Sequence, residues 1–205
     1  AALAGPFQGA TLPVNLPTPL DKAERLADWA ARPRMAVFRP DRPNGAAVLV
    51  TPGGGYRWVV IDKEGYEIGR WLSARGFTVF VLFYRLPGEG WAAGPDVALS
   101  DAQRAMRLIR HRATSFGVDP ERVAAMGFSA GGHLASTVIT HLEAGNPAAS
   151  DPIDKESARP DFAILIYPVI TLVEEKFVHK GSRSNLTGDN QELWPELSSE
   201  RHVSK

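Results

Sequence analysis

One serine lies between two glycines in the stretch MGFSAGGHLA, residues 126–135, where Gly127, Ser129 and Gly131 fit the pattern G-x-S-x-G. The residues before Ser129 predict a strand and those after it a helix. A turn this sharp requires a strained backbone at the serine, and it lifts the hydroxyl to the carboxyl edge of a sheet. Ser129 is therefore a candidate nucleophile. The alternative is an ordinary glycine-rich turn whose serine caps the helix.

A second glycine-rich stretch, TPGGGYRW (51–58), follows the first predicted buried strand. It lacks the lysine of a phosphate-binding loop, and Trp58 occupies the third glycine position of a dinucleotide fingerprint. Backbone N–H groups without side chains in the way suit the stabilisation of an oxyanion in acyl transfer. We expect an oxyanion hole made by Gly54 and Gly55 together with Ala130, whereas the alternative is a flexible surface loop.

Alternating strands and helices position these two loops. The pattern indicates an α/β fold with a mostly parallel sheet covered by helices on both faces. Apolar runs without alternation indicate strands buried on both faces, including the last one. The predicted strands are 34–40, 46–50, 77–83, 122–128 and 161–170, and the predicted helices are 64–76, 96–117 and 130–142.

The chain divides into a proline-rich arm, residues 1–34, and one α/β core, residues 35–205. Seven of the 16 prolines fall within the first 43 residues, and we expect a short helical stretch at 21–31 within the arm. The first residues, AALAGPFQGA, lack methionine, which fits an end left by a signal peptidase as well as a cloning remnant. We favour a secreted or periplasmic protein over a cytoplasmic one.

Composition excludes several classes of function. The formal net charge of zero favours neither nucleic acid nor an acidic membrane surface as a partner. No apolar run reaches the roughly 18 residues of a membrane span. The absence of cysteine excludes disulfides and thiolate sites, and no ligand spacing indicates a metal, so we expect no cofactor. Asp101 and Arg104 are expected to form a solvated pair. Oligomeric state stays open.

The chain resembles the α/β-hydrolase fold and, within it, the esterases related to acetyl xylan esterases and to hormone-sensitive-lipase-like esterases. The resemblance rests on PGGGY, FVLFYRLP, DAQRAMRLIRHRATSFGVDPERVAAMGFSAGGHLA, RPDFAILIYPVI and HKGSRSNLTG. It implies hydrolysis of carboxylic esters, often short acyl esters of a sugar or small molecule, through an acyl-enzyme on Ser129. Many relatives have histidine before the glycines, where this chain has Pro52.

The base and acid of a catalytic triad are missing from the pattern. In this fold they follow the serine on loops after later strands, yet no apolar run of four residues occurs after Val173. We therefore interpret the chain as a hydrolase core without its C-terminal strands, which leaves the strand at 161–170 open on one side. His133 is expected to be a packing histidine. A flexible tail could bring His202 back as a substitute base.

Other functions stay open beside the esterase. A serine peptidase of the prolyl-oligopeptidase type shares the same turn, and a truncated or non-catalytic hydrolase scaffold would retain the fold without activity. The expected partner is a small-molecule or saccharide ester. Three aromatic residues follow strands at the catalytic edge, and we expect Tyr56, Trp58 and Trp91 to form the wall for the substrate, with loop anchors as the alternative.

Overall fold

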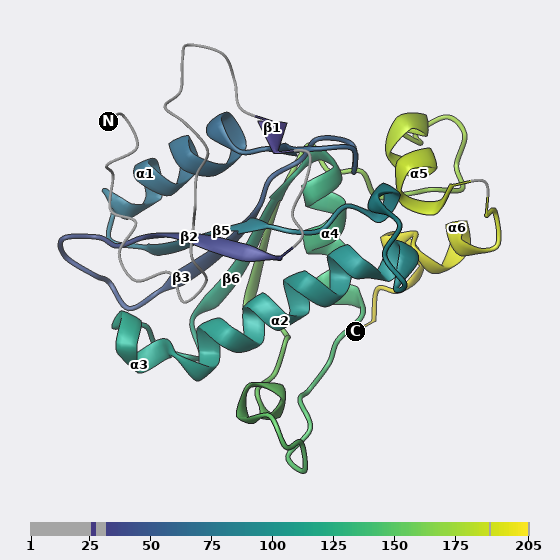
Figure 1. Ribbon diagram of the computed structural model, residues 1–205. Coiled ribbons are helices and arrows are strands. Elements are labelled where there is room, and N and C mark those ends of the chain that lie inside the picture. Colours follow the sequence, from purple (N-terminus) through teal and green to yellow (C-terminus); the bar gives the residue numbers. More distant parts are fainter. Residues whose placement is uncertain (1–25, 28–31, 189, 205) are drawn as a thin grey trace.

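A five-stranded mixed sheet forms the centre of the computed structural model, which describes residues 26–27, 32–188 and 190–204 (Figure 1). The strand order is β2-β5-β3-β6-β7. β2 runs antiparallel to β5, and all other neighbours in the sheet are parallel. The strands are β2 (Arg34–Phe38), β3 (Ala47–Thr51), β5 (Thr78–Phe83), β6 (Val123–Phe128) and β7 (Phe162–Ile166).

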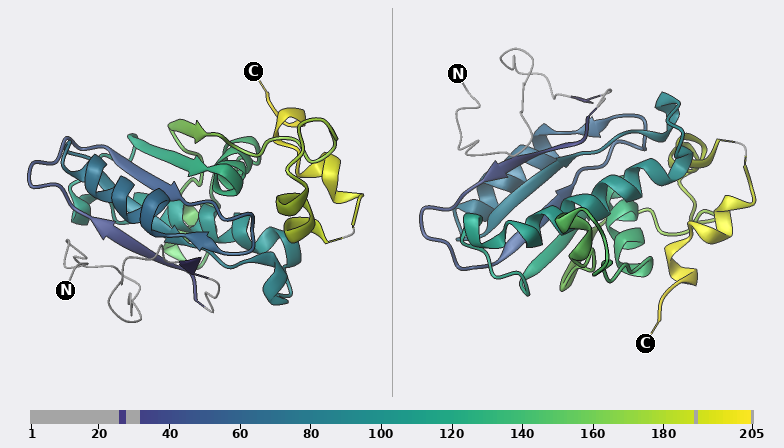
Figure 2. Two further views of the ribbon diagram at one scale, coloured as in Figure 1. Left: turned by 90° about the horizontal axis from the view of Figure 1, so that it is seen from above. Right: turned by 60° about the horizontal axis from the view of Figure 1, so that its bottom comes forward.

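Helices cover both faces of this sheet, as Figures 1 and 2 show. α1 (Glu67–Ser73) packs over β2 and β5, whereas α2 (Val97–His111) lies beside α4 (Ser129–Thr140) on the opposite face. The remaining helical segments are η1 (Asp62–Tyr66), η2 (Pro87–Glu89), η3 (Gly94–Asp96), α3 (Ala113–Phe116), η4 (Pro152–Lys155), α5 (Lys180–Thr187), α6 (Leu193–Glu196) and η5 (Ser199–Arg201).

The core lies at the central strands. Every residue of β3 and β5 is buried, which confirms the interpretation of the uninterrupted apolar runs as strands covered on both faces. Phe80 and Leu49 are paired across β5 and β3 and are almost wholly inaccessible. The prediction of an α/β fold with a mostly parallel sheet is therefore confirmed, and β2 is its one antiparallel member among the strands described.

The last strand of the sheet, β7, is less buried than predicted and has the predicted open edge. We predicted a buried strand at 161–170, but β7 is short and its side chains are largely exposed, including Phe162 at 73% and Ile164 at 42%. The physical reason is its position: β7 pairs only with β6 among the described strands and forms the edge of the sheet. The open apolar edge is the feature that the sequence predicted for this strand.

The first strand also differs from expectation. Leu26–Ala27 form β1, which pairs antiparallel with β4 (Val59–Val60), so the helical prediction for 21–31 is wrong at these two residues. A partner strand distant in sequence decides this conformation, and local propensity does not contain that information. The rest of that predicted helix, and residues 1–31 of the arm other than β1, lie outside the described residues.

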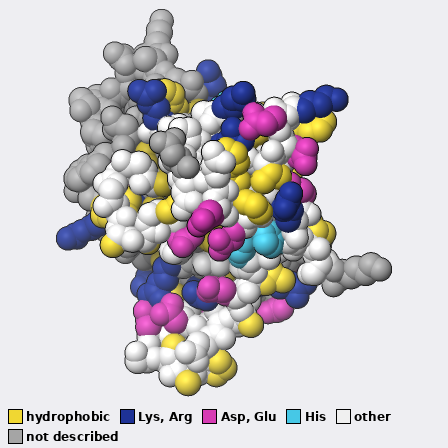
Figure 3. Space-filling model, turned by 90° about the vertical axis from the view of Figure 1, so that its right-hand side faces the viewer, with side chains coloured by type: hydrophobic (Ala, Val, Ile, Leu, Met, Phe, Trp, Pro, Cys, Tyr) yellow, Lys and Arg dark blue, Asp and Glu magenta, His cyan; other side chains and the backbone are white. Residues whose placement is uncertain are grey.

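The surface carries both signs of charge. On the side of the molecule that bears α5 and α6, acidic and basic side chains are interspersed and neither forms a continuous area (Figure 3). Within the described residues, none of the helices combines the length and the apolar character that a bilayer crossing requires.

Candidate active site

Ser129 lies on the sharp turn between β6 and α4. Its φ is +50°, a left-handed value that is unfavourable for a residue with a side chain, whereas the preceding Phe128 is extended at φ −120° and ψ 134°. α4 begins at Ser129 itself, and the serine is partly exposed. The predicted strain is confirmed, and the turn leaves the side chain accessible from the carboxyl edge of the sheet.

The glycines on either side of Ser129 allow strand and helix to approach closely. A Cβ on Gly127 would lie 2.1 Å from the carbonyl oxygen of Gly131, and a Cβ on Gly131 would lie 2.1 Å from the carbonyl oxygen of Thr51. The Thr51 hydroxyl donates a hydrogen bond of 2.8 Å to the carbonyl of Gly131. These contacts explain physically why both second neighbours of the serine are glycine.

The glycine loop after β3 lies against this turn. A Cβ on Gly53 would be 3.0 Å from Cβ of Ser129 and 2.7 Å from the carbonyl oxygen of Phe128. Gly54 and Gly55 both have positive φ, at +130° and +65°, so the loop needs glycine at these positions. The structure thus brings together the two glycine-rich stretches that the sequence singled out, although they are more than 70 residues apart.

The carbonyl groups of the glycine loop are all occupied. The carbonyl of Gly53 accepts from Val60 N–H at 2.9 Å, and that of Gly54 accepts from Arg57 N–H at 3.1 Å. The carbonyl of Gly55 accepts from the side-chain amide of Asn185 on α5 at 2.8 Å. By contrast, the N–H groups of Gly54, Gly55 and Tyr56 have no acceptor among the described residues. Within the described part of the chain, these donors are thus left available to a ligand.

Ala130 supplies a further N–H group. It is the second residue of α4, and the first N–H groups of a helix have no acceptor within the helix. Its methyl group is fully buried. Gly54, Gly55 and Ala130, the three donors expected from the sequence, are therefore left without an acceptor among the described residues.

His133, one helical turn after Ser129, is a packing residue. It is 1% exposed, with Nδ1 at 2.7 Å from the hydroxyl of Tyr56 and Nε2 at 2.6 Å from the carbonyl oxygen of Leu197. Burial lowers the pKa of His133 to about 4, so the ring is neutral at neutral pH. Both ring nitrogens are engaged, and neither is free to take a proton from Ser129.

His202 lies at the wrong end of α4. Its ring is 4.9 Å from that of His141, which follows the last residue of the helix, whereas Ser129 is the first. Twelve helical residues separate the two ends by about 18 Å. The expectation that the tail could supply His202 as a base is therefore wrong for this structure.

The other histidines are also engaged elsewhere. His179 caps α5 by accepting from the Ser182 N–H at 3.1 Å, and His111 lies 3.7 Å from Glu156. All five histidines of the chain belong to the described residues, and no hydrogen bond joins any of them to Ser129.

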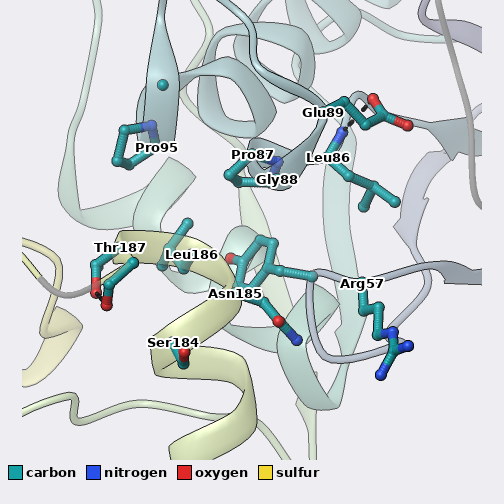
Figure 4. A pocket seen from close by; sticks show the side chains of 13 residues that line it. Arg57, Leu86, Pro87, Gly88, Glu89, Pro95, Ser184, Asn185, Leu186 and Thr187 are labelled. Carbon is teal, nitrogen blue, oxygen red and sulfur yellow. Dashed lines mark hydrogen bonds between the residues drawn. The ribbon is translucent and has the colours of Figure 1, made fainter.

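A surface cavity of about 560 Å³ opens beside the glycine loop (Figure 4). Tyr56 and Arg57, which directly follow Gly55, form one side of it. Residues of the η2–η3 region and the C-terminal half of α5 form the others, with Asn185 pointing toward the glycine loop. The lining mixes apolar side chains such as Leu86 and Leu186 with hydroxyl, amide and charged groups. Such a lining suits a polar organic molecule.

The three aromatic residues proposed as a substrate wall occupy different places. Tyr56 lines the cavity, but it is only 2% exposed and its hydroxyl is engaged by His133. Trp58 and Trp91 are not among the lining residues. Each of these two tryptophans instead contacts a residue that does line the cavity. The guanidinium of Arg57 lies over the Trp58 ring, and the Trp91 indole donates a hydrogen bond of 2.9 Å to the Glu89 carboxylate.

Asp101 and Arg104 do not pair, which corrects the sequence interpretation. Asp101 is 4% exposed and accepts three side-chain hydrogen bonds from Arg85, while it also accepts from the Arg85 N–H at 2.9 Å. Arg104 points the other way and pairs with Asp151 and Asp154. Their positions three residues apart would allow them to pair, but each finds a partner distant in sequence, and the buried pair of Asp101 and Arg85 ties the loop after β5 to α2.

Sequence analysis missed the side chains that hold the glycine loop. Glu64 accepts from the Gly53 N–H at 2.6 Å, and the Tyr84 hydroxyl donates to the Pro52 carbonyl at 2.7 Å. Asn185 comes from a helix 130 residues further along the chain. Tyr84 and Asn185 belong to stretches that carry the family resemblance, but no spacing indicates that these residues hold the loop, because they meet it only through the tertiary fold.

Several known proteins are similar to this chain. Acetylxylan esterase of Xylanibacter ruminicola is 35% identical over 80% of this chain and 31% of its own length. Endo-1,4-beta-xylanase B of Butyrivibrio fibrisolvens is 35% identical over 76% of this chain and 24% of its own length. The structure of an acetyl ester-xyloside bifunctional hydrolase from Caldicellulosiruptor lactoaceticus superposes with a TM-score of 0.75 at 38% identity, covering 84% of this chain and 62% of that chain.

The chain thus spans about a third or less of the curated relatives named here, and less than two thirds of the solved one. The family model BD-FAE matches residues 35–183, from β2 through the nucleophile turn to α5. These residues contain both glycine-rich stretches and all of the central sheet except Arg34, the first residue of β2. With this match and the α/β-hydrolase fold, the chain belongs to the BD-FAE family of esterases.

Proposed function

We propose that this chain carries the nucleophile and the oxyanion hole of a serine esterase. Oγ of Ser129 attacks the carbonyl carbon of an ester while a base takes the hydroxyl proton. The alcohol leaves with that proton, and water then hydrolyses the acyl-enzyme. The N–H groups of Gly54, Gly55 and Ala130 stabilise the negative charge on the carbonyl oxygen.

The observation that carries this proposal is the state of the glycine loop. Its three glycine carbonyls are hydrogen-bonded within the protein, the N–H groups of Gly54 and Gly55 lack acceptors among the described residues, and Gly53 lies against Cβ of the strained Ser129. Pre-oriented donors beside a nucleophile are the arrangement that acyl transfer requires. A helix-capping role for Ser129 is not supported, because Phe128 occupies the N-cap position and Ser129 is the first residue of α4 itself.

The general base has to reach Ser129 from outside the described residues. The nucleophile turn borders the open edge strand: the N–H of Val169, just after β7, donates to the carbonyl of Ser129 at 3.0 Å. The ring of Tyr167 lies 5.9 Å from that of Phe128. A further strand beside β7 would carry its loop to this same edge, because the carboxyl ends of parallel strands meet there.

For the substrate we propose a short acyl ester, acetyl above all, of a saccharide or small alcohol. The relatives named above include an acetylxylan esterase and an acetyl ester-xyloside hydrolase, which supports an acetylated xylan-type saccharide. The cavity beside Tyr56 and Arg57 supports the same choice, since its mixed lining can receive the sugar part. Esterase names among the relatives favour ester over amide hydrolysis.

Chemical rescue tests the proposal. The 205-residue protein is treated with a fluorophosphonate, with and without added imidazole, and its intact mass is measured. Imidazole is small enough to act as the absent base at the open edge. We expect little adduct without imidazole and an adduct on Ser129 whose rate rises with imidazole concentration. Ser129→Ala serves as the background for modification elsewhere.

Two results would contradict parts of this proposal. A folded chain that stays unmodified at every imidazole concentration would refute Ser129 as a nucleophile. An adduct that forms rapidly without imidazole would keep Ser129 as the nucleophile but refute the external base.

A further inference from the structure

The peptide group that joins Pro52 to Gly53 is held at both of its polar ends. Its carbonyl accepts a hydrogen bond of 2.7 Å from the hydroxyl of Tyr84, and its N–H donates one of 2.6 Å to Oε2 of Glu64. Tyr84 is fully buried, and burial together with the nearby Glu64 carboxylate raises its pKa, so its hydroxyl keeps its proton. This peptide immediately precedes the N–H groups of Gly54 and Gly55.

The fold places Glu64 at this spot through an unusual helical turn. η1 is a π-helical segment, closed by the hydrogen bond of 2.8 Å from the Tyr66 N–H to the Ile61 carbonyl. Gly65 lets this turn sit close to β5, because a Cβ there would lie 2.8 Å from Cγ1 of Val81. The turn also lies close to Pro52, whose Cγ would be 3.5 Å from the same hypothetical Cβ.

The second oxygen of the Glu64 carboxylate is also held. Oε1 accepts a hydrogen bond of 3.0 Å from the hydroxyl of Tyr167, the residue directly after β7. Tyr167 has a positive φ of +36°, and its ring packs on Phe128 beside Ser129. With both oxygens engaged, the carboxylate has a fixed orientation and links the glycine loop to the strand edge next to the nucleophile.

The orientation of this peptide affects the loop because it begins a run of three glycines, Gly53 to Gly55. Glycine has low barriers to several backbone conformations, so an unsupported loop of this composition would sample many orientations of its N–H groups. A rotation of the 52–53 peptide plane would break the bonds to Tyr84 and Glu64 together. The Glu64 carboxylate also occupies the Gly53 N–H, so the donors left to a ligand are those that follow.

We propose that Glu64 and Tyr84 are positioning residues for the oxyanion hole. By hydrogen-bonding to the Pro52–Gly53 peptide, they fix the orientation in which the N–H groups of Gly54 and Gly55 bind the developing oxyanion. The inference rests on the proposed function for the role of those N–H groups. It goes beyond that function because it assigns the orientation of the hole to side chains that hydrogen-bond to the loop backbone and not, among the described contacts, to Ser129.

The first test measures the imidazole-assisted phosphonylation of Ser129 as a function of probe concentration. Glu64→Ala is expected to lower the maximal rate about 100-fold, because a displacement of about 1 Å in a catalytic group has effects of this size. The half-saturating probe concentration stays unchanged. Glu64→Gln recovers most of the rate, since its amide oxygen can still accept from the Gly53 N–H, and Tyr84→Phe behaves like Glu64→Ala.

Glu67→Gln is the matched control, three residues further on in the exposed first turn of α1, and it leaves the rate unchanged. A purely structural role would reduce the rate only in proportion to the folded fraction, measured by thermal unfolding. An unchanged maximal rate in fully folded Glu64→Ala would overturn the inference.

The second test needs no catalysis and separates the inference from the proposed function. Amide hydrogen exchange is followed by ¹⁵N NMR at Gly53, Gly54 and Gly55. The wild-type Gly53 amide is expected to be protected, and Glu64→Ala removes this protection and shifts the resonances of Gly54 and Gly55, whereas Glu64→Gln retains both. If the wild-type chain resists phosphonylation altogether, the proposed function fails. The NMR measurement can still be made in that case, and unchanged Gly54 and Gly55 resonances in Glu64→Ala would refute the positioning role.

Discussion

The hydroxyl of Tyr56 and Nδ1 of His133 are joined by a hydrogen bond of 2.7 Å that ties the glycine loop to the nucleophile helix. The direction of this bond follows from the other ring nitrogen. Nε2 lies 2.6 Å from the carbonyl oxygen of Leu197, which can only accept, so Nε2 carries the proton and Nδ1 accepts from Tyr56. One neutral histidine thus connects the loop after β3, the helix α4 and the segment after α6.

The stability of the protein is expected to depend on this histidine below neutral pH. Burial lowers the pKa of His133 from 6.5 to about 4, so between these values the unfolded chain binds a proton that the folded protein does not. The free energy of unfolding is therefore at its full value above pH 6.5 and falls by about 3 kcal/mol as the pH decreases to 4.

Urea unfolding at several pH values measures this slope. His133→Gln can keep both hydrogen bonds but does not titrate, so the slope between pH 6.5 and 4 should flatten. His202→Gln, a partly exposed control, should retain it. An equal slope in wild type and His133→Gln would show that other groups are responsible.

The strained backbone at Ser129 should be a source of instability. Ser129 holds φ at +50°, which glycine adopts without penalty. We expect Ser129→Gly to raise the free energy of unfolding by about 1 kcal/mol, whereas Ser129→Ala keeps the strain and gives no such gain. Ala130→Gly, one residue further in the same helix, should instead lower it by about 1 kcal/mol. Stabilisation by Ser129→Ala equal to that by Ser129→Gly would contradict the role of strain.

Replacing Arg85 and replacing Asp101 should lower the free energy of unfolding by different amounts. The Asp101 side chain is 3% exposed and that of Arg85 is 27% exposed, so only the arginine can turn to water. Arg85→Met leaves a buried carboxylate and should lower the free energy of unfolding by about 3–5 kcal/mol. Asp101→Asn should cost about 1–2 kcal/mol.

Arg104→Met provides the control for this comparison. Arg104 and its partner Asp151 are 41% and 40% exposed, so its loss should change stability by less than about 1 kcal/mol. Chemical denaturation of the three variants checks the order, and equal losses for Arg85→Met and Asp101→Asn would refute the argument from burial.

The open edge of β7 should promote self-association. Phe162 is 73% exposed on an edge strand whose outward backbone groups lack a partner strand among the described residues. Phe162→Lys should reduce association, measured by analytical ultracentrifugation, without loss of stability. Phe177 is 72% exposed but lies outside any strand, so Phe177→Lys separates strand pairing from general hydrophobicity. An equal effect of both substitutions would argue against edge pairing.

The nucleophile turn was predictable from the sequence because its determinants are local. A strand, a serine flanked by Gly127 and Gly131, and a helix follow one another within about 20 residues, and backbone sterics alone then require the strained turn. The buried strands were predictable for a similar reason, since uninterrupted apolar runs such as β3 are stable only when both faces are covered.

Tertiary structure alone decided how the glycine loop is held. Glu64, Tyr84 and Asn185 reach the loop from a π-helical turn, the end of β5 and α5, and no local pattern identifies them. The pairing of Asp101 with Arg85 instead of Arg104, and the exposure of β7, were likewise settled by neighbours distant in sequence. Local sterics and periodicity act within a few residues, so they determine elements and turns. Hydrogen-bond partners and burial depend on which elements meet in space, and only the folded chain specifies them.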